Sequence, residues 1–195
     1  MVIVHHTWKP TAADYQGIET VRGVRRYHME KGWSDNGYNK MVGPSGEIFD
    51  CRPIERAGAH CKGQNSYSIG ISYIADFDAQ EPATYAGLAA GQQIVAALCE
   101  RFDLEPEDVY FHRDFAHKSC PGNKMNRADY RDAVRQFMSN GLKVVLLPGS
   151  EPIACRPQIE DGVTRVDLRS LAEALGYEVI TDHLADQNKI YLRQP

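Results

Sequence analysis

The sequence predicts an α/β protein in which a mixed central β-sheet is flanked by helices, followed by a small C-terminal α+β module. Three observations support this class. The β-branched run VIVHH at residues 2–6 is typical of a buried strand. Two long stretches, 18–31 and 82–102, carry apolar residues at helical spacing. Two strand-like runs around a Gly-Pro-Ser-Gly turn favour a hairpin, and a hairpin combined with helical crossovers indicates a mixed sheet.

The first helix is expected over residues 18–31, where arginines separate apolar residues that recur at helical spacing: Ile18, Val21, Val24 and Tyr27. Gly32 then ends this helix. Strands are expected at 38–42 and 47–51, joined by the turn into the hairpin. Residues 68–74 alternate apolar with small side chains, which predicts a further strand.

A second long helix is expected over residues 82–102, which open with a proline and carry several apolar residues: Leu88, Ile94, Val95 and Leu98. A short strand at 109–112 and a helix at 127–138 complete the main domain. The character of the sequence changes after Ser139-Asn140-Gly141, so we place a domain boundary near Gly141. The predicted domains are therefore 1–141 and 142–195.

The smaller domain is expected to hold short strands and one helix. The run VVLL predicts a strand, the segment TRVDLRSLAEALG predicts a helix, and two more short strands are expected near EVI and IYL. This order of elements predicts a small α+β module.

Composition restricts the class of partner. The 195 residues carry a net charge of −4 with scattered charges, so the chain offers no basic field for nucleic acid. No apolar stretch approaches the roughly 18 to 20 residues of a membrane span. The five cysteines are odd in number and sparse, which fits synthesis in a reducing cytosol. The N-terminus lacks a basic region followed by a long apolar core, so we expect no signal peptide.

Candidate metal ligands follow two of the predicted strands. The pair His5-His6 ends the first strand, and His112 and Cys120 lie in the string FHRDFAHKSCPG after a later strand. Two imidazoles and a thiolate are ligands that suit Zn²⁺ and leave its fourth position open for water, as in catalytic zinc sites. Spacing alone leaves chance proximity of the seven histidines as an alternative. Strand alternation selects one histidine of the pair without saying which.

Four motifs occur in a characteristic order: VHHT, GYNKMVGPSGEIFDCRP, GAHCKGQNSYSIGIS and FHRDFAHKSCPG. Together they resemble the type 2 N-acetylmuramoyl-L-alanine amidases, a family that includes phage T7 lysozyme and the peptidoglycan recognition proteins. The likeness covers residues 2 to about 138. It implies a mixed sheet with a zinc-bearing groove, and hydrolysis of the amide bond between N-acetylmuramic acid and L-alanine in bacterial peptidoglycan.

The resemblance also implies roles for single residues. It places the zinc ligands on His5, His112 and Cys120. It places the groups that assist the reaction on Tyr38 and Lys118, whose phenol and ammonium can donate hydrogen bonds to the oxyanion formed from the amide carbonyl. It assigns substrate binding to His60, Asn65 and Arg52. For Arg52, a guanidinium suits a stem-peptide carboxylate, and a structural salt bridge is the alternative.

The C-terminal segment resembles the small stalk-like modules named after the copper amine oxidase N-terminal domain. The likeness lies in GVTRVDLRSLAEALGYEV and KIYLRQ. We expect no copper site there, because His183 is the only histidine beyond His117. The module is expected to bind wall polymer, or to form a homo-oligomer through an exposed strand edge.

The resemblance leaves three functions open. The first is a lytic amidase such as a phage or prophage endolysin, made in the cytoplasm without a signal peptide and acting at the cell wall after release. The second is a cytosolic amidase that recycles muropeptides, whose third ligand is usually aspartate. The third is a non-catalytic recognition module. Because the chain keeps Cys120 and Tyr38, we predict an enzyme.

Overall fold

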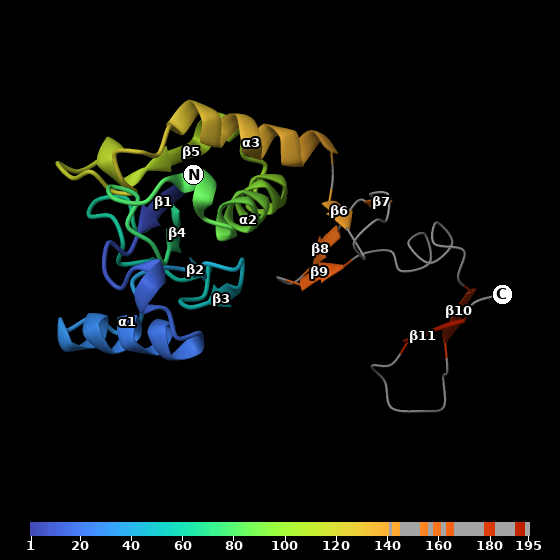
Figure 1. Ribbon diagram of the computed structural model, residues 1–195, viewed down its shortest axis with the longest axis horizontal. Coiled ribbons are helices and arrows are strands. Elements are labelled where there is room, and N and C mark those ends of the chain that lie inside the picture. The colour runs from blue at the N-terminus through green and yellow to red at the C-terminus, as the bar shows by residue number, and fades with distance from the viewer. Residues whose placement is uncertain are drawn as a thin grey trace. The chain divides into compact units, whose positions relative to one another are not determined.

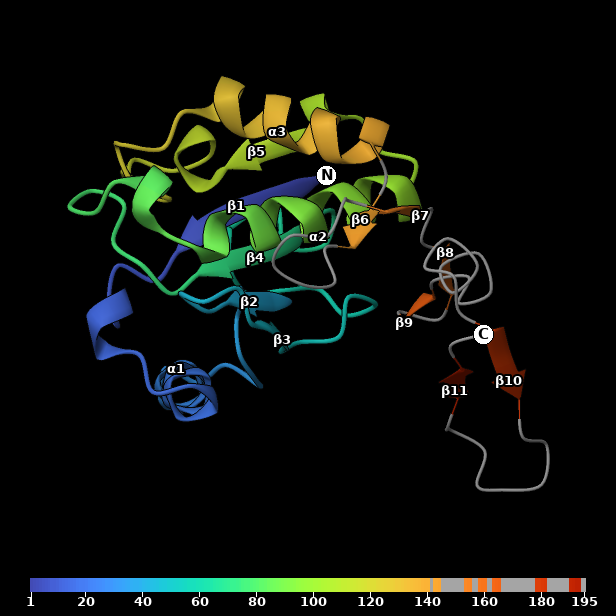
Figure 2. The ribbon, with the colours of Figure 1, turned by 45° about the vertical axis from the view of Figure 1, so that its right-hand side comes forward.

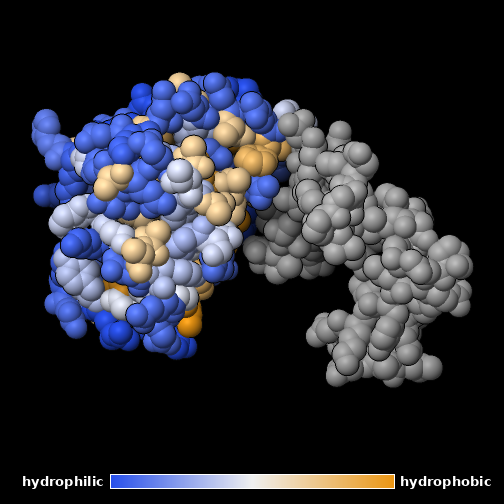
Figure 3. All heavy atoms as spheres, viewed as in Figure 1, coloured by the Kyte–Doolittle hydropathy of each residue, from blue (hydrophilic) through white to orange (hydrophobic). Residues whose placement is uncertain are grey.

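The computed structural model describes residues 1–140 and six short strands beyond them: 142–144, 153–155, 158–160, 163–165, 178–181 and 190–193. The chain divides into two compact units, Met1–Gln136 and Phe137–Pro195. The first unit holds the sheet, two of the three helices labelled in Figure 1 and most of the third, α3, whose last residues belong to the second unit. The face of this unit seen in Figure 3 is largely hydrophilic, with apolar residues scattered over it.

A five-stranded mixed sheet forms the centre of the first unit, as predicted, with the strand order β3-β2-β4-β1-β5. Its members are β1 (Val2–His6), β2 (Lys40–Val42), β3 (Ile48–Asp50), β4 (Ile69–Tyr73) and β5 (Val109–Phe111). Strands β2, β4, β1 and β5 are parallel, and only β3 pairs antiparallel, as the second arm of the predicted hairpin. The C-terminal ends of the four parallel strands therefore lie along one edge of the sheet.

Three helices pack around this sheet: α1 (Ile18–Glu30), α2 (Gly87–Arg101) and α3 (Arg127–Asn140). The helix predicted to begin near residue 82 begins later. Pro82–Thr84 instead forms a separate 3₁₀ turn. The Tyr85 hydroxyl donates to the carbonyl of Val42 at 2.9 Å, and the Gly87 N–H donates to the carbonyl of Pro44 at 2.8 Å. These bonds anchor the chain to the end of β2 before the helix can start.

Strand alternation determines which side chains face which helix. Met41 on β2 is paired with Ser72 on β4, and His5 on β1 is also paired with Ser72, so these side chains share one face. Met41 packs there against Val21 and Val24 of α1. Tyr73 lies on the opposite face, which α2 covers (Figure 2). His5 therefore points to the α1 side of the sheet.

The second unit is described only through three antiparallel pairs. They are β6 (Leu142–Val144) with β7 (Ile153–Cys155), β8 (Gln158–Glu160) with β9 (Val163–Arg165), and β10 (Glu178–Thr181) with β11 (Ile190–Arg193). Gly141, at the predicted domain boundary, lies outside the described residues. So do residues 166–176 of the helix predicted over 164–176, whose first two residues belong to β9. The likeness to the stalk modules stays a prediction. Among the described residues, no helix combines the length and apolarity that crossing a bilayer requires.

Candidate metal centre

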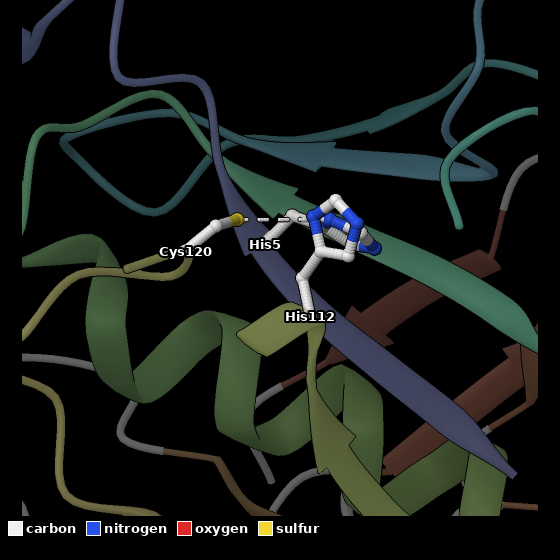
Figure 4. A group of neighbouring side chains, drawn as sticks. All are labelled: His5, His112 and Cys120. Carbon is white, nitrogen blue, oxygen red and sulfur yellow. Dashed lines mark hydrogen bonds between the residues drawn. The ribbon is translucent and has the colours of Figure 1, made fainter. Parts of the chain in front are cut away.

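Three predicted ligands converge at the C-terminal edge of the parallel strands. His5 lies near the end of β1, His112 directly follows β5, and Cys120 lies in the loop after it. Because β1 and β5 are parallel neighbours with Val4 opposite Phe111, the residues that follow them emerge side by side. One ligand atom of each of the three residues lies within 4.8 Å of the others. Figure 4 shows the three side chains turned toward one another.

The distances within this group are those of a compact donor set. The Cys120 Sγ lies 3.7 Å from Nδ1 of His5. The rings of His5 and His112 are 4.5 Å apart between centroids. His5 is only 1% exposed and Cys120 is 9% exposed, whereas His112 is half-buried. The group therefore lies at the base of a depression, with His112 nearest the solvent.

Burial keeps both imidazoles neutral. It lowers the pKa of His5 well below its usual value, and the neighbouring His60 and His112 lower it further. Burial also lowers the pKa of His112 to about 4, with a further contribution from the Lys118 ammonium. A neutral imidazole has a free lone pair, which is the form that binds a metal ion. Both rings are therefore in the ligand form at neutral pH.

Burial favours the protonated form of the Cys120 thiol, which is not the form that binds a metal ion. Burial raises its pKa to about 12, although the His6 backbone N–H and the Lys118 ammonium oppose this shift. The His6 N–H lies 3.4 Å from the sulfur. A cation held at this point would replace the proton and stabilise the thiolate. Two neutral imidazoles and one thiolate form a set that fits Zn²⁺ with one position left open.

Hydrogen bonds with two side chains, those of Asp78 and Arg113, hold the loop that carries Cys120 in place. The Asp78 carboxylate accepts a 2.6 Å hydrogen bond from the Ser119 hydroxyl and a 2.7 Å bond from the Asn123 N–H. On the other side, the Arg113 guanidinium donates to three loop carbonyls: those of Ser119, Gly122 and Met125. The position of the sulfur is therefore set by side chains outside the ligand group.

A second group of possible ligands, His6 with Asp76 and Asp78, lies beside the first. Nδ1 of His6 accepts the Phe77 N–H at 3.1 Å, so the neutral ring carries its proton on Nε2 and has no free lone pair. Both oxygens of Asp78 already accept hydrogen bonds from the Cys120 loop. This second group is thus a hydrogen-bonded support, and His5 is the member of the histidine pair that faces Cys120.

Tyr38 and Lys118 lie at the same depression. The Tyr38 ring is 5.3 Å from the His5 ring between centroids, and burial raises the pKa of its hydroxyl, which stays protonated as a donor. Lys118 is exposed and lines the cavity together with His112. The structure therefore brings both predicted groups to the ligand set.

The three predicted substrate-binding residues occupy different surroundings. His60 and Asn65 line a cavity, and the Asn65 side-chain oxygen also accepts the backbone N–H groups of His60 and Cys61 at 2.9 Å each. Arg52 is 9% exposed and lines neither of the two cavities beside the ligand group. Its guanidinium donates to three backbone carbonyls, those of Asp35, Asn36 and Ala57. The structure thus gives Arg52 a role in holding loops, and its contact with substrate stays a prediction.

Two adjoining cavities of about 950 Å³ and about 430 Å³ meet at the ligand group. They share five lining residues: Trp33, Ala59, His60, His112 and Lys118. The larger cavity is also lined by residues that the sequence analysis did not select: Trp8, Tyr27, His28 and Lys31. Trp8 is 58% exposed and has a positive φ of 60°. His28 follows Val24 by one helical turn, and this spacing could have placed it on the face of α1 that turns toward the sheet.

Comparison with known protein families identifies the family to which this chain belongs. The family model described as N-acetylmuramoyl-L-alanine amidase (Amidase_2) matches residues 1–123. The chain belongs to this amidase family. The match contains all three residues of the ligand group as well as Tyr38 and Lys118, and it ends before α3.

Relatives of this amidase family member include proteins named for recognition and proteins named for catalysis. Peptidoglycan-recognition protein SC1a of Drosophila melanogaster is 34% identical over 127 residues, which cover 62% of this chain and 66% of that protein. The structure of the amidase LysC from Clostridium intestinale URNW aligns with a TM-score of 0.60 over 69% of this chain and 84% of that one; at 23% identity it supports the fold alone.

A third similar protein is a mutant of Drosophila PGRP-LB, whose structure was determined in complex with tracheal cytotoxin. It is 28% identical and aligns with a TM-score of 0.58, covering 64% of this chain and 75% of that one. The mixed sheet with flanking helices is therefore the fold of this family.

Proposed function

We propose that this protein is a zinc-dependent N-acetylmuramoyl-L-alanine amidase that acts on bacterial peptidoglycan. The observation that carries the proposal is the convergence of His5, His112 and Cys120 on one point at the base of a cavity of about 950 Å³. Tyr38 and Lys118 line the same cavity. A donor set of this composition, left open toward a cavity, is typical of catalytic rather than structural zinc.

The chain's own groups perform the steps around the reacting amide. A zinc ion bound there would supply the Lewis acidity that polarises the amide carbonyl and activates water for attack. The Tyr38 hydroxyl and the Lys118 ammonium donate hydrogen bonds to the oxygen of that carbonyl as negative charge develops on it. The cavity walls hold the substrate so that the scissile amide lies over the ligand group.

The reaction consumes one water molecule. A bond forms between the water oxygen and the lactyl carbonyl carbon of N-acetylmuramic acid, and the C–N bond to L-alanine breaks. Both protons of the water end on the leaving nitrogen, which departs as an ammonium group, and Lys118 is the exposed group at the site that can relay them. The products are a lactyl carboxylate on the glycan and a stem peptide with a free L-alanine amino group.

Two features support catalysis over recognition alone. The family model that matches the chain is named for the amidase, whereas a relative such as peptidoglycan-recognition protein SC1a is named for recognition. Within the described residues, both imidazoles are neutral and the sulfur lies 3.7 Å from His5, so the ligand set is complete. The complex of the PGRP-LB mutant with tracheal cytotoxin supports a muropeptide as the ligand class.

The biological role is part of the proposal. We assign the protein to lysis of the cell wall, as an endolysin made in the cytoplasm and acting at the wall after release. Cys120 as third ligand favours this role over recycling of soluble muropeptides, for which the sequence resemblance leads us to expect aspartate. The unit Phe137–Pro195 is assigned to wall binding or to assembly of a homo-oligomer.

A pair of cysteine variants tests the proposal. Cys120→Ser should lose bound zinc and hydrolysis of purified peptidoglycan while keeping the circular dichroism of the parent protein. Cys51→Ser is the matched control, because Cys51 follows β3, is partly buried and lines neither cavity. It should keep both zinc and activity. Full hydrolysis by Cys120→Ser without bound zinc would overturn the assignment.

A further inference from the structure

We propose that His60 is a positioning residue that holds the His5 ring in one tautomer and one orientation, with Nδ1 directed to the metal. This inference rests on the proposed zinc site. It gives His60 a function that precedes substrate binding, because the ring acts on a ligand of the metal in the free enzyme.

The hydrogen bond between the two rings is the first observation. Nε2 of His5 lies 3.0 Å from Nδ1 of His60. The rings meet edge to face, with 5.0 Å between centroids and 83° between planes. On the other side of the His5 ring, Nδ1 is the atom that lies 3.7 Å from the Cys120 sulfur. The two ring nitrogens of His5 therefore face different partners: Nε2 faces His60, and Nδ1 faces Cys120.

The two directions define the tautomer. A ligand nitrogen needs a free lone pair, so a metal-bound Nδ1 requires that the neutral His5 ring carry its proton on Nε2. That proton can be donated only if Nδ1 of His60 is unprotonated, which places the proton of neutral His60 on its own Nε2. The bond thus runs from Nε2–H of His5 to Nδ1 of His60. Metal-ligating histidines almost always donate their second nitrogen in this way.

The His60 ring is held by its surroundings. It is 8% exposed, and its backbone N–H donates to the Asn65 side chain at 2.9 Å. Two glycines make room for it: a Cβ on Gly58 would lie 2.4 Å from its Cδ2, and a Cβ on Gly70 would lie 2.5 Å from the same atom. Gly70 lies on β4, two residues before the partner of His5, so it belongs to the His5 face of the sheet.

This packing determines what His60 can do. Its Nε2 is buried, and the backbone of Ser68 acts on the ring by a hydrogen-bonding contact. The ring lines the two cavities, and its Nδ1 is paired with Nε2 of His5. A residue of this kind controls the orientation of its neighbour, and its loss should weaken metal binding before any substrate is present.

Zinc affinity of the full chain, measured against a competing chromophoric chelator, tests this role. His60→Leu removes the acceptor at similar size, and His60→Asn returns an oxygen near the position of Nδ1. We expect the zinc Kd to rise about 10–100-fold in His60→Leu and to stay within about threefold of the parent in His60→Asn, the range known for such supporting partners. His117→Asn is the control, because His117 is exposed and lines neither cavity.

Two outcomes would overturn the role of His60. One is an unchanged zinc Kd in His60→Leu together with a raised KM, which would make His60 a substrate contact. The other is a ¹⁵N NMR spectrum of the unmodified protein that shows the His5 proton on Nδ1, a readout that does not depend on folding of any variant. Absence of zinc binding by the unmodified protein would instead overturn the proposed function, so the two failures are distinguishable.

Discussion

Replacing Asp78 by Asn should loosen the loop that carries Cys120 and lower the stability of the main domain. The Asp78 carboxylate accepts the Ser119 hydroxyl at 2.6 Å and the Asn123 N–H at 2.7 Å. An asparagine keeps one acceptor oxygen and places an N–H₂ group against the other donor. The variant therefore keeps one hydrogen bond, now to a neutral acceptor, and turns the other contact into a repulsion between two donors.

The size of the effect follows from the type of bond. A hydrogen bond to a charged group contributes about 1.5–3 kcal/mol, so two such bonds set an upper limit of about 3–6 kcal/mol. Asp78 is only half-buried, and water partly replaces what is lost. We therefore expect the free energy of unfolding to fall by about 2 kcal/mol, which is below that upper limit.

Urea unfolding followed by tryptophan fluorescence measures this loss in the right part of the chain. Both tryptophans, Trp8 and Trp33, lie in the first unit, so the signal does not report on the second one. Asp132→Asn is the control, because Asp132 forms a surface pair with Arg135 and its side chain is 65% exposed. It should change stability by less than about 0.5 kcal/mol.

The pH dependence gives an independent check. Partial burial raises the pKa of Asp78, but hydrogen bonds from Ser119 and Asn123 outweigh it, so the pKa lies below the ordinary 3.8. A lowered folded-state pKa gives stability that is present above pH 3.8 and lost as pH falls through the folded value. The difference between parent and Asp78→Asn should therefore be constant at neutral pH and shrink below about pH 4. Equal unfolding free energies of the parent and Asp78→Asn at pH 7 would refute the role of Asp78 in holding the Cys120 loop.

Three further predictions use other contacts. Gly122→Ala should lower the melting temperature and weaken zinc binding, because Gly122 has φ +119° and an added Cβ would lie 2.3 Å from the Phe77 carbonyl carbon; calorimetry showing no shift would contradict this. Tyr130→Phe should cost about 1 kcal/mol in urea unfolding by removing the 2.7 Å bond to the Tyr73 hydroxyl, and an unchanged midpoint would count against that bond. Zinc at 100 times its Kd should stabilise the protein by about 2.7 kcal/mol, and Cys120→Ser should not respond.

The strands were predictable because their signal is local. The β-branched run at 2–6 and the turn between 42 and 47 identify β1 and the hairpin without tertiary information. The start of α2 was not predictable in this way. A proline at 82 permits a helix to begin, but the bonds from Tyr85 and Gly87 to the end of β2 delay it to Gly87.

The site shows the same division between local and tertiary information. Family motifs brought His5, His112 and Cys120 together as ligands, whereas composition and spacing left His5 and His6 equivalent. The bond from the Phe77 N–H to His6 separates them, and it depends on a turn 71 residues away in the chain. The hydrogen bond between His5 and His60 depends likewise on residues 55 positions apart. No local pattern records such pairings.

Contributions of Trp8 and His28 to the cavity were missed for a related reason. A single tryptophan after a strand and a histidine on a helix are common and carry no motif of their own. They become part of the site only because α1 and the loop after β1 lie beside the ligand group, where both residues line the larger cavity. Their selection required the packing of α1 on the sheet.

Mass spectrometry of purified peptidoglycan digested by the protein tests the central claim most directly. Three digests are needed: with the zinc-loaded protein, with a chelator added, and with the chelator followed by excess zinc. We predict stem peptides with a free L-alanine amino terminus in the first and third digests and none in the second. Intact peptidoglycan in all three digests, with the protein still bound to it, would contradict the account and identify a recognition module instead.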